Sequence, residues 1–356
     1  MSNEFLVPTG FVIKDYLEEL DISQKELAKR MGMSEKHISN LLNGKSKLTE
    51  EFAIKLEKII HAVPASYWLN YESKYREYKV RNELTQNLNE SELRKLDEKF
   101  NFTTIFSGLG FNLKEQANEM LKLLKISSFE LFENVYSNLE VDFMEDGGTK
   151  EAIAVWLNIA KEEIEIQNKD LTNINYDEIK FEDSLPRFKK LALNNNYESS
   201  IKSARKLLNK LGVYLVLCDA IPNSKVRGAL TTYKKRPVIL LSARFKSHDH
   251  VWFALIHEIG HLLLHYVPNK PLITMESELE LKKVSQKEEE ANKFSRDFFI
   301  NYDDYKEFIR LQKFDKDSIE QFAKKQNVLP GIVVARLQRE GYLRFDQLNF
   351  LREYKS

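Results

Sequence analysis

The sequence is short of cysteine, and this limits the kinds of site that it can build. Cys218 is the one cysteine in 356 residues, which excludes an intrachain disulfide framework and argues against a cysteine-based metal site. Such scarcity is typical of a chain kept in a reducing compartment. Cys218 follows the apolar run 213–217, so we expect it to be buried in a strand.

Long apolar runs are also missing. The sequence has no stretch of about eighteen apolar residues free of charge, so we expect no membrane span. The segment Met1–Phe5 lacks the basic residues followed by apolar ones that mark a secretion signal. Because neither membrane insertion nor export has a signal here, we expect a cytoplasmic protein.

The chain carries no formal net charge, since 54 basic residues balance 54 acidic ones. This balance neither favours nor excludes a nucleic-acid partner, and charge has to be compared segment by segment. Charged residues make up 30% of the chain and apolar residues 42%, which is typical of a folded globular protein. The length alone predicts two or three domains.

One apolar run carries histidines at a spacing that suits a metal ion. His257, Glu258 and His261 lie within residues 251–264, whose length without proline predicts a buried helix. Residues four apart share a helix face, so both imidazoles can reach one ion, and Glu258 is rotated to lie beside it. Zinc hydrolases use this arrangement. The alternative, a buried helix with two hydrogen-bonded histidines, leaves an unpaired buried carboxylate.

A third protein ligand is expected from a second helix that follows the first. Glu288, Glu289 and Glu290 begin this helix, and Glu289 falls almost opposite its apolar face. Helical periodicity favours Glu288 over Glu290 only weakly. The apolar face consists of Ala291, Phe294 and Phe298.

Other histidines nearby compete for the role of ligand. His265 lies one turn after His261 and is the main rival, although three ligands along one straight helix would diverge from a single ion. We assign His248 and His250 to the loop that starts the helix, with Asp249 as a candidate N-cap.

Residues 1–82 have the pattern of a compact helical domain with a helix-turn-helix. Ser23 and Ser34 are predicted to cap two short helices, and Gly32 separates them. The second of these helices would enter the major groove by its N-terminal residues. The alternative is a helical protein-interaction domain with a solvated polar face. The candidate DNA-contacting residues are Gln24, Ser34, Glu35, Lys36, His37, Ser39, Asn40, Lys45 and Lys47.

The rest of the chain predicts helices and a small sheet. The pattern of residues 83–200 predicts a largely helical connector without a catalytic signature. The segments 212–218, 229–233 and 238–241 are rich in β-formers. The last two predict an antiparallel hairpin beside the histidine helix, where its edge would pair with an extended substrate. Helices are expected again at 317–325 and 329–338, and Arg227 or Tyr233 could stabilise an oxyanion.

The histidine motif resembles that of a known enzyme family. His257-Glu258-Ile259-Gly260-His261 followed by Glu288-x-x-Ala291-Asn292 is similar to the ImmA/IrrE metallo-endopeptidases, in which the glutamate three before the alanine is the third ligand. The resemblance implies Zn²⁺ held by His257, His261 and Glu288, with Glu258 as general base. Mn²⁺ or Co²⁺ also suits such a ligand set.

The N-terminal segment resembles the Xre/Cro type of helix-turn-helix and, through Pro64–Asn70, HigA-like antitoxins. The resemblance implies a double-stranded DNA operator and a homodimer. We thus expect a mainly α, α+β fold with a small antiparallel sheet. Its parts would be an N-terminal helix-turn-helix bundle (1–82), a helical connector (83–200) and a zincin-like domain with a helical C-terminal tail (201–356).

Two functions follow from these resemblances. The first is a DNA-binding regulator whose zinc endopeptidase domain cleaves a specific regulatory protein in a stress, phage or toxin–antitoxin response. The alternative is an antitoxin-like repressor that neutralises a toxin, with the peptidase fold as a sensor or structural domain. A general proteinase conflicts with the DNA-binding segment.

Overall fold

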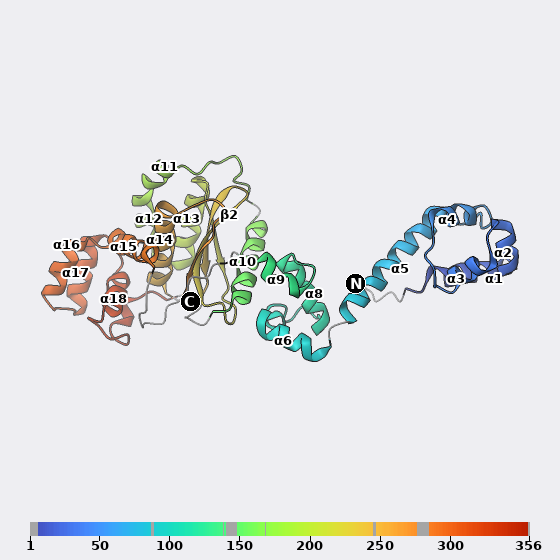
Figure 1. The fold of residues 1–356 in the computed structure, drawn as a ribbon. Helices are drawn as coiled ribbons and strands as arrows, with labels where there is room; N and C mark the ends of the chain where they lie inside the picture. Colours follow the sequence, from blue (N-terminus) through green and yellow to red (C-terminus); the bar gives the residue numbers. More distant parts are fainter. Residues whose placement is uncertain are drawn as a thin grey trace. The chain divides into compact units, whose positions relative to one another are not determined.

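A computed structural model describes most of the chain, and the described residues are 6–86, 89–137, 139, 148–167, 169–244, 247–275 and 285–354. They form two compact units, Met1–Leu93 and Arg94–Ser356, which Figure 1 shows in chain order. Within the described ranges, no helix combines the length and the apolar character that a membrane span needs. The sequence also predicts a turn at 142–148, and this segment lies, apart from Gly148, outside these ranges.

The first unit is a helical bundle around one core. Leu27, Ile38, Phe52 and Trp68 are fully buried in it. Helices of eight residues are marginal alone, so this burial is what keeps them folded. The helices are α1 (Thr9–Glu19), α2 (Gln24–Met31), α3 (Glu35–Leu42), α4 (Glu50–Glu57) and α5 (Ala65–Gln86).

The serine caps predicted for α2 and α3 are confirmed. Ser23 Oγ accepts a hydrogen bond from the backbone of Glu26 at 3.2 Å, and Ser34 Oγ accepts one from His37 at 3.2 Å. Each bond satisfies a backbone donor that the helix itself leaves free. The carboxylate of Glu26 pairs with Arg30 at 2.9 Å rather than closing a capping box.

A buried carboxylate joins three parts of this bundle. Glu72 on α5 is 6% exposed. Its oxygens accept hydrogen bonds from the hydroxyl of Thr9, from Leu48 N at 3.4 Å and from Arg76 Nε at 2.7 Å. Because burial of a carboxylate is tolerated only with such partners, Glu72 fixes α1 and the loop before α4 against α5.

The second unit begins with helices, as expected for the connector. Its sequence predicts helices near 115–124, 129–135 and 151–167. All three are present with small changes of bounds, and the second is divided into η1 and α9. The elements are α6 (Glu90–Phe100), which spans the boundary between the units, α7 (Phe102–Ile105), α8 (Leu113–Leu124), η1 (Phe129–Leu131), α9 (Phe132–Val135) and α10 (Lys150–Ile166).

A four-stranded sheet follows, in the order β1-β3-β2-β4. The predicted β2–β3 hairpin is confirmed, and β1 pairs with β3 in parallel, so the sheet is mixed. β4 was not predicted, and it pairs antiparallel with β2. It therefore covers the hairpin edge at which we expected the substrate. The strands are β1 (Tyr214–Cys218), β2 (Val226–Tyr233), β3 (Arg236–Ser242) and β4 (Leu272–Met275).

Helices cover both faces of this sheet. Ile239 and Leu241 of β3 belong to the same core as the helices α13 and α14. The alternate residues Val238 and Leu240, also fully buried, point to the opposite face, where α10 lies (Figure 1). The α+β fold class is confirmed. The helices on the first face are α11 (Glu178–Glu182), α12 (Leu185–Leu191), α13 (Tyr197–Lys210) and α14 (His248–Leu264).

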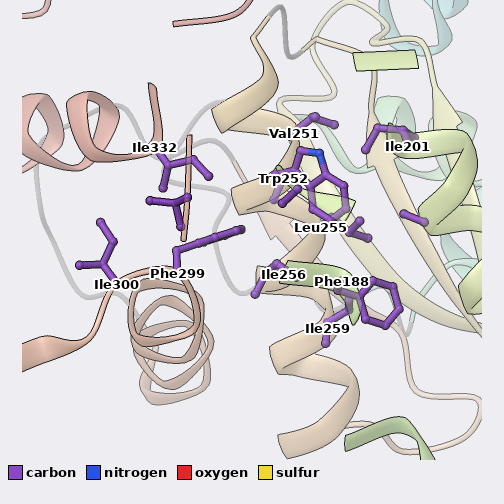
Figure 2. Packing of buried hydrophobic residues seen from close by; sticks show 14 of the residues in the cluster. Phe188, Ile201, Val251, Trp252, Leu255, Ile256, Ile259, Phe299, Ile300 and Ile332 are labelled. Atoms are coloured by element: carbon purple, nitrogen blue, oxygen red, sulfur yellow. The ribbon is translucent and has the colours of Figure 1, made fainter. Parts of the chain in front are cut away.

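α14 runs through the middle of this core. Figure 2 shows its buried side chains between residues of α12 and α13 on one side and residues of the C-terminal helices on the other. The residues that Figure 2 labels are Val251, Trp252, Leu255, Ile256 and Ile259 of α14, Phe188 and Ile201 on one side, and Phe299, Ile300 and Ile332 on the other.

Helices complete the second unit, and those predicted at 317–325 and 329–338 are confirmed as α17 and α18. α16 was not predicted. These elements are α15 (Gln286–Phe299), α16 (Tyr302–Arg310), α17 (Lys316–Gln326), α18 (Pro330–Arg339) and the short η3 (Asn349–Leu351).

The chain after η3 holds the start of α14. Arg352 forms an ion pair with Asp249 at 2.7 Å, with side chains 8% and 2% exposed, and also donates to Ser247 Oγ at 3.1 Å. The prediction that Asp249 caps α14 is wrong, because Ser247 occupies the cap position. The assignment of His248 and His250 to a loop is also wrong, since both lie in the first turn of α14.

Candidate metal centre and nucleic-acid interface

One face of α14 brings two imidazoles together. His257 and His261 are one turn apart, and their Nε2 atoms lie 3.0 Å from each other. Their side chains are 5% and 2% exposed. The other faces of α14 are held in the core by residues such as Leu255 and Ile259 (Figure 2), so the side of the helix on which both rings lie is fixed.

α15 crosses α14 where both helices carry small residues, Gly260 and Ala291. A Cβ added at Gly260 would lie 3.4 Å from Ala291 Cα and 3.1 Å from the Phe294 ring, so only glycine permits this approach without displacement. The crossing places the first turn of α15 over the imidazoles. There Glu288 Oε1 lies 3.0 Å from His261 Nε2, and Oε2 lies 3.1 Å from His257 Nε2.

The donor set of these three side chains fits a divalent metal ion. Among the described residues, His257, His261 and Glu288 form the group of potential ligands whose donor atoms all lie within 4.8 Å. Around tetrahedral zinc, with Zn–N near 2.0–2.1 Å, neighbouring ligand atoms are about 3.3 Å apart. The separations of 3.0 and 3.1 Å here are close to that spacing. Two imidazoles and a carboxylate also accept Mn²⁺ or Co²⁺.

The charge of Glu288 is set by its surroundings. Burial alone would raise the pKa of Glu288, but hydrogen bonds from His257 and His261 outweigh it and hold that pKa well below its ordinary value. A carboxylate kept ionised between two imidazole nitrogens is the state in which it can act as a ligand.

Glu258 lies beside this group in a different environment. It is 1% exposed, and burial is the largest cause that raises its pKa to about 7. Its Oε2 has no hydrogen-bond partner among the described residues. Gly228 of β2 makes room for the carboxylate, because a Cβ at that position would collide with Glu258 Oε1. One oxygen of a buried carboxylate is therefore left free to receive a proton.

The rival ligands lie outside the group. Glu289 is exposed, as expected. Glu290 Oε2 is 2.8 Å from His265 Nε2, and His265 Nδ1 faces His261 Nδ1 at 3.1 Å, behind the ring rather than on the Nε2 side. His250 Nε2 lies 3.1 Å from Arg352 Nη2 rather than near the group.

Basic side chains lie in the neighbourhood of the centre. The Arg339 guanidinium lies 5.9 Å from the ring centroid of Phe253, and that ring is 6.5 Å from the ring of His257. Burial, and then the positive charges of Arg227 and Arg296, lower the pKa of Arg339 to about 10. The oxyanion role considered for Arg227 stays a prediction, and the hydroxyl of Tyr233, the other candidate, donates to Glu165 on α10.

The candidate DNA-contacting residues line the start of α3 and its surroundings. Ser34, Glu35, Lys36 and His37 are exposed at its first turn, and Lys45 and Lys47 are exposed in the loop that follows. Asn40 and Ser39 are half-buried one turn on, and Gln24 Nε2 donates to Glu35 O at 3.4 Å. Because the buried Ile38 and Leu41 fix the opposite face of α3, its polar face is presented to solvent.

Sequence reasoning missed two supports of the centre. Gly228 and the Asp249–Arg352 pair act through contacts between residues far apart in the chain. The glycine interrupts the β-rich segment 226–233, and glycine inside a strand is a known signal of close approach. The ion pair had no comparable local signal.

Two protein families match this chain. A helix-turn-helix family matches residues 13–68, and a peptidase family described as the IrrE N-terminal-like domain matches residues 208–338. The second match includes α14 and α15, and thus all four side chains of the candidate centre.

Several bacterial proteins are similar over shorter stretches. The uncharacterized HTH-type transcriptional regulators YddM and YbaQ of Escherichia coli K12 are 41% and 31% identical over 64 and 77 residues. These alignments cover 18% and 22% of this chain and 67% of each relative. Virulence-associated protein A of Dichelobacter nodosus is 35% identical over 60 residues, or 17% of this chain and 59% of that protein.

One solved structure, a crystal structure of a hypothetical protein from E. coli, is 29% identical with a TM-score of 0.20. The similarity covers 25% of this chain and 85% of the chain in that structure.

Proposed function

This chain belongs to the proteins that join an Xre-like helix-turn-helix domain to an ImmA/IrrE-like peptidase domain, and we propose that it is a DNA-binding regulator with a metal-dependent endopeptidase of narrow specificity. Its substrate is one regulatory protein rather than proteins in general. The observation that carries the proposal is the free, buried carboxylate oxygen of Glu258 beside His257, His261 and Glu288.

The ligand role falls to His257, His261 and Glu288. Their donor atoms converge, and the ionised state of Glu288 suits an ion with two positive charges. When bound, Zn²⁺ supplies Lewis acidity that lowers the pKa of water and polarises a peptide carbonyl.

Glu258 moves the proton. Its free Oε2 accepts a proton from the attacking water while the water oxygen bonds to the scissile carbonyl carbon. The same oxygen then gives the proton to the leaving amine as the carbon–nitrogen bond breaks. Burial of Glu258 and the close approach of Gly228 keep the carboxylate in one place through both transfers.

The substrate backbone is proposed to pair with β4. This strand lies at the end of the sheet order, and its residue Thr274 is opposite Gly228, which contacts Glu258. An extended peptide added at that edge would run beside the carboxylate, with strand addition supplying main-chain hydrogen bonds.

DNA binding is proposed for the exposed face of α3. Lys45 and Lys47 would contact phosphates, and Lys36, Ser39 and Asn40 of α3 would reach base edges. We propose a homodimer on a repeated or palindromic operator, because paired half-sites are the usual geometry of this motif.

Glu258→Gln tests the peptidase part directly. The amide keeps size and hydrogen-bonding reach but cannot take a proton, so we expect cleavage of the native partner to fall about 10²–10⁴-fold. Metal content and operator binding should not change. The readout is cleavage of the partner, supplied from the native gene neighbourhood, together with relief of repression in a reporter strain.

A wild-type response of Glu258→Gln in that strain would overturn the peptidase role. The antitoxin-like regulator, which binds a toxin and its own promoter and uses the peptidase fold as a sensor or scaffold, would then replace it. In that case a small toxin gene beside this one is the expected neighbour.

A further inference from the structure

His265 lies directly behind one of the proposed ligands. Its Nδ1 is 3.1 Å from Nδ1 of His261, whose other nitrogen, Nε2, faces His257 and Glu288. The backbone N–H of His265 also donates to His261 O at 2.9 Å as α14 ends. With its side chain 7% exposed, His265 is held against the back of the His261 ring by main chain and side chain together.

The other nitrogen of His265 meets a carboxylate on α15. His265 Nε2 lies 2.8 Å from Glu290 Oε2, and Gln286, one turn earlier, donates to Glu290 Oε1 at 2.8 Å. Glu290 is thus held from both sides. Gln286, Glu290, His265 and His261 form one chain of hydrogen bonds that ends at the candidate metal centre.

The direction of this chain follows from the chemistry of its groups. An ionised carboxylate only accepts hydrogen bonds, so Glu290 requires the N–H of His265 at Nε2. Nδ1 of a neutral His265 is then an acceptor, and Nδ1 of His261 has to donate to it. A neutral imidazole has one N–H, so Nε2 of a neutral His261 carries the lone pair that a metal ion held with His257 and Glu288 would use. In the metal-free chain, a second proton on Nε2 lets His261 donate to Glu288.

We propose that His265 and Glu290 are positioning residues, which fix His261 in the tautomer that can bind a metal ion through Nε2. The inference rests on the proposed function in one respect, since the ion is what that lone pair receives. Hydrogen-bond partners of metal-bound histidines typically change metal affinity or activity about 10–100-fold. Glu290 therefore serves the centre without being a ligand.

A simpler role would be that the pair only ties α15 to α14. Removal of either group would then change stability but not the tautomer of His261. The two roles therefore differ in a property that can be read in the metal-free protein.

The main experiment compares two neighbouring substitutions in the full chain. Glu290→Gln offers an amide N–H to His265 and so permits the reversed chain, in which the His261 proton sits on Nε2. Glu289→Gln makes the same change of charge on an exposed neighbour. In titrations with Zn²⁺ and Co²⁺ against a competing chelator, we expect Glu290→Gln to lower affinity about 10–100-fold, and Glu289→Gln to leave it within about twofold.

Substitutions of His265 provide a rescue. His265→Phe keeps the volume near that of the ring and removes the acceptor, so metal affinity should fall as in Glu290→Gln. His265→Gln can present its carbonyl oxygen to His261 Nδ1 and should recover part of the loss. If His265→Phe fails to fold, Glu290→Gln still decides, because the Glu290 side chain is 45% exposed.

Histidine ¹⁵N NMR of the metal-free chain gives the second readout. At a pH at which His261 is neutral, we expect its Nδ1–H form in the wild type and in Glu289→Gln, and a gain of the Nε2–H form in Glu290→Gln. Equal tautomer populations and equal metal affinities in Glu290→Gln and Glu289→Gln would overturn the inference. If the wild type bound neither Zn²⁺ nor Co²⁺, the proposed function would fail, while the tautomer comparison would still decide the inference.

Discussion

Each unit of this protein buries a glutamate, and the two carboxylates differ in how completely they are hydrogen-bonded. Glu72 of the first unit uses both oxygens, with Thr9, Leu48 and Arg76 as donors. Glu258 of the second unit is even less exposed, yet its Oε2 has no partner among the described residues. A fully bonded carboxylate holds parts of a fold together, whereas an incompletely bonded one retains the capacity to react.

The two carboxylates are therefore expected to have different roles, Glu72 in the stability of the fold and Glu258 in the proposed reaction. The hydrogen bonds that link Glu72 on α5 to α1 and to the loop before α4 offset the cost of burying its charge. We therefore expect that removal of Glu72 lowers the stability of the first unit. Glu258 contributes no comparable link, and its loss is expected in turnover.

The largest effect is expected for loss of a ligand. Glu288→Ala should lower Zn²⁺ content from about one ion per chain to a small fraction, because a three-ligand site loses its single charged donor. Metal analysis of the purified chain measures this, with Glu289→Ala as the matched control. Full occupancy in Glu288→Ala, with loss instead in Glu290→Ala, would make Glu290 the third ligand and contradict the assignment.

Arg352→Ala tests how much the Asp249–Arg352 pair at the start of α14 stabilises the second unit. It leaves Asp249 buried without its partner, and breaking such a pair costs about 3–5 kcal/mol. The control is Arg344→Ala, whose pair with Asp346 is exposed on both sides and contributes about 0–1 kcal/mol. Chemical unfolding measures both, and equal stabilities would show that the tail does not hold α14.

Glu72→Gln tests the stabilising side of the comparison. The neutral amide cannot satisfy every donor that surrounds Glu72, so we expect the first unit to lose about 1–3 kcal/mol of unfolding free energy. Zn²⁺ content should not change. Glu77→Gln on the exposed face of α5 is the control, and a stability of Glu72→Gln equal to that control would remove the contrast with Glu258.

The smallest effect is expected on the surface of the first unit. Lys36→Ala combined with Asn40→Ala should weaken operator binding about tenfold, or about 1.4 kcal/mol, and non-specific binding less. Titrations at several salt concentrations measure both, since phosphate contacts release counterions. Lys58→Ala, on the exposed C-terminal cap of α4, is the control. Equal losses on operator and random DNA would mean that α3 does not read bases.

Local patterns carried much of what the sequence could predict. The spacing of His257 and His261 on a long apolar run is enough for two rings on one helix face, and the serines before α2 and α3 act only on their own helices. The choice of Glu288 over Glu290 required the family resemblance, because both lie on the same turn of α15 and periodicity barely separates them.

The remaining features depend on contacts that no local pattern encodes. β4 is short and pairs with a strand more than forty residues earlier, so its effect on the hairpin edge could not be foreseen. Asp249 satisfied the composition rule for an N-cap, but its carboxylate is taken by Arg352, 103 residues away in the chain. Long-range partners outweighed local preference in both cases.

The Asp249–Arg352 pair also sets an order of events during synthesis. The first unit ends at Leu93, whereas the start of α14 lacks its partner until Arg352 has been made. At about 5–20 residues per second, the roughly 260 residues between them take about 13–52 seconds to translate. During that interval a nascent chain can fold its helix-turn-helix unit while α14 is either not yet made or still without its partner Arg352, so the first unit would be complete on the ribosome before the second is.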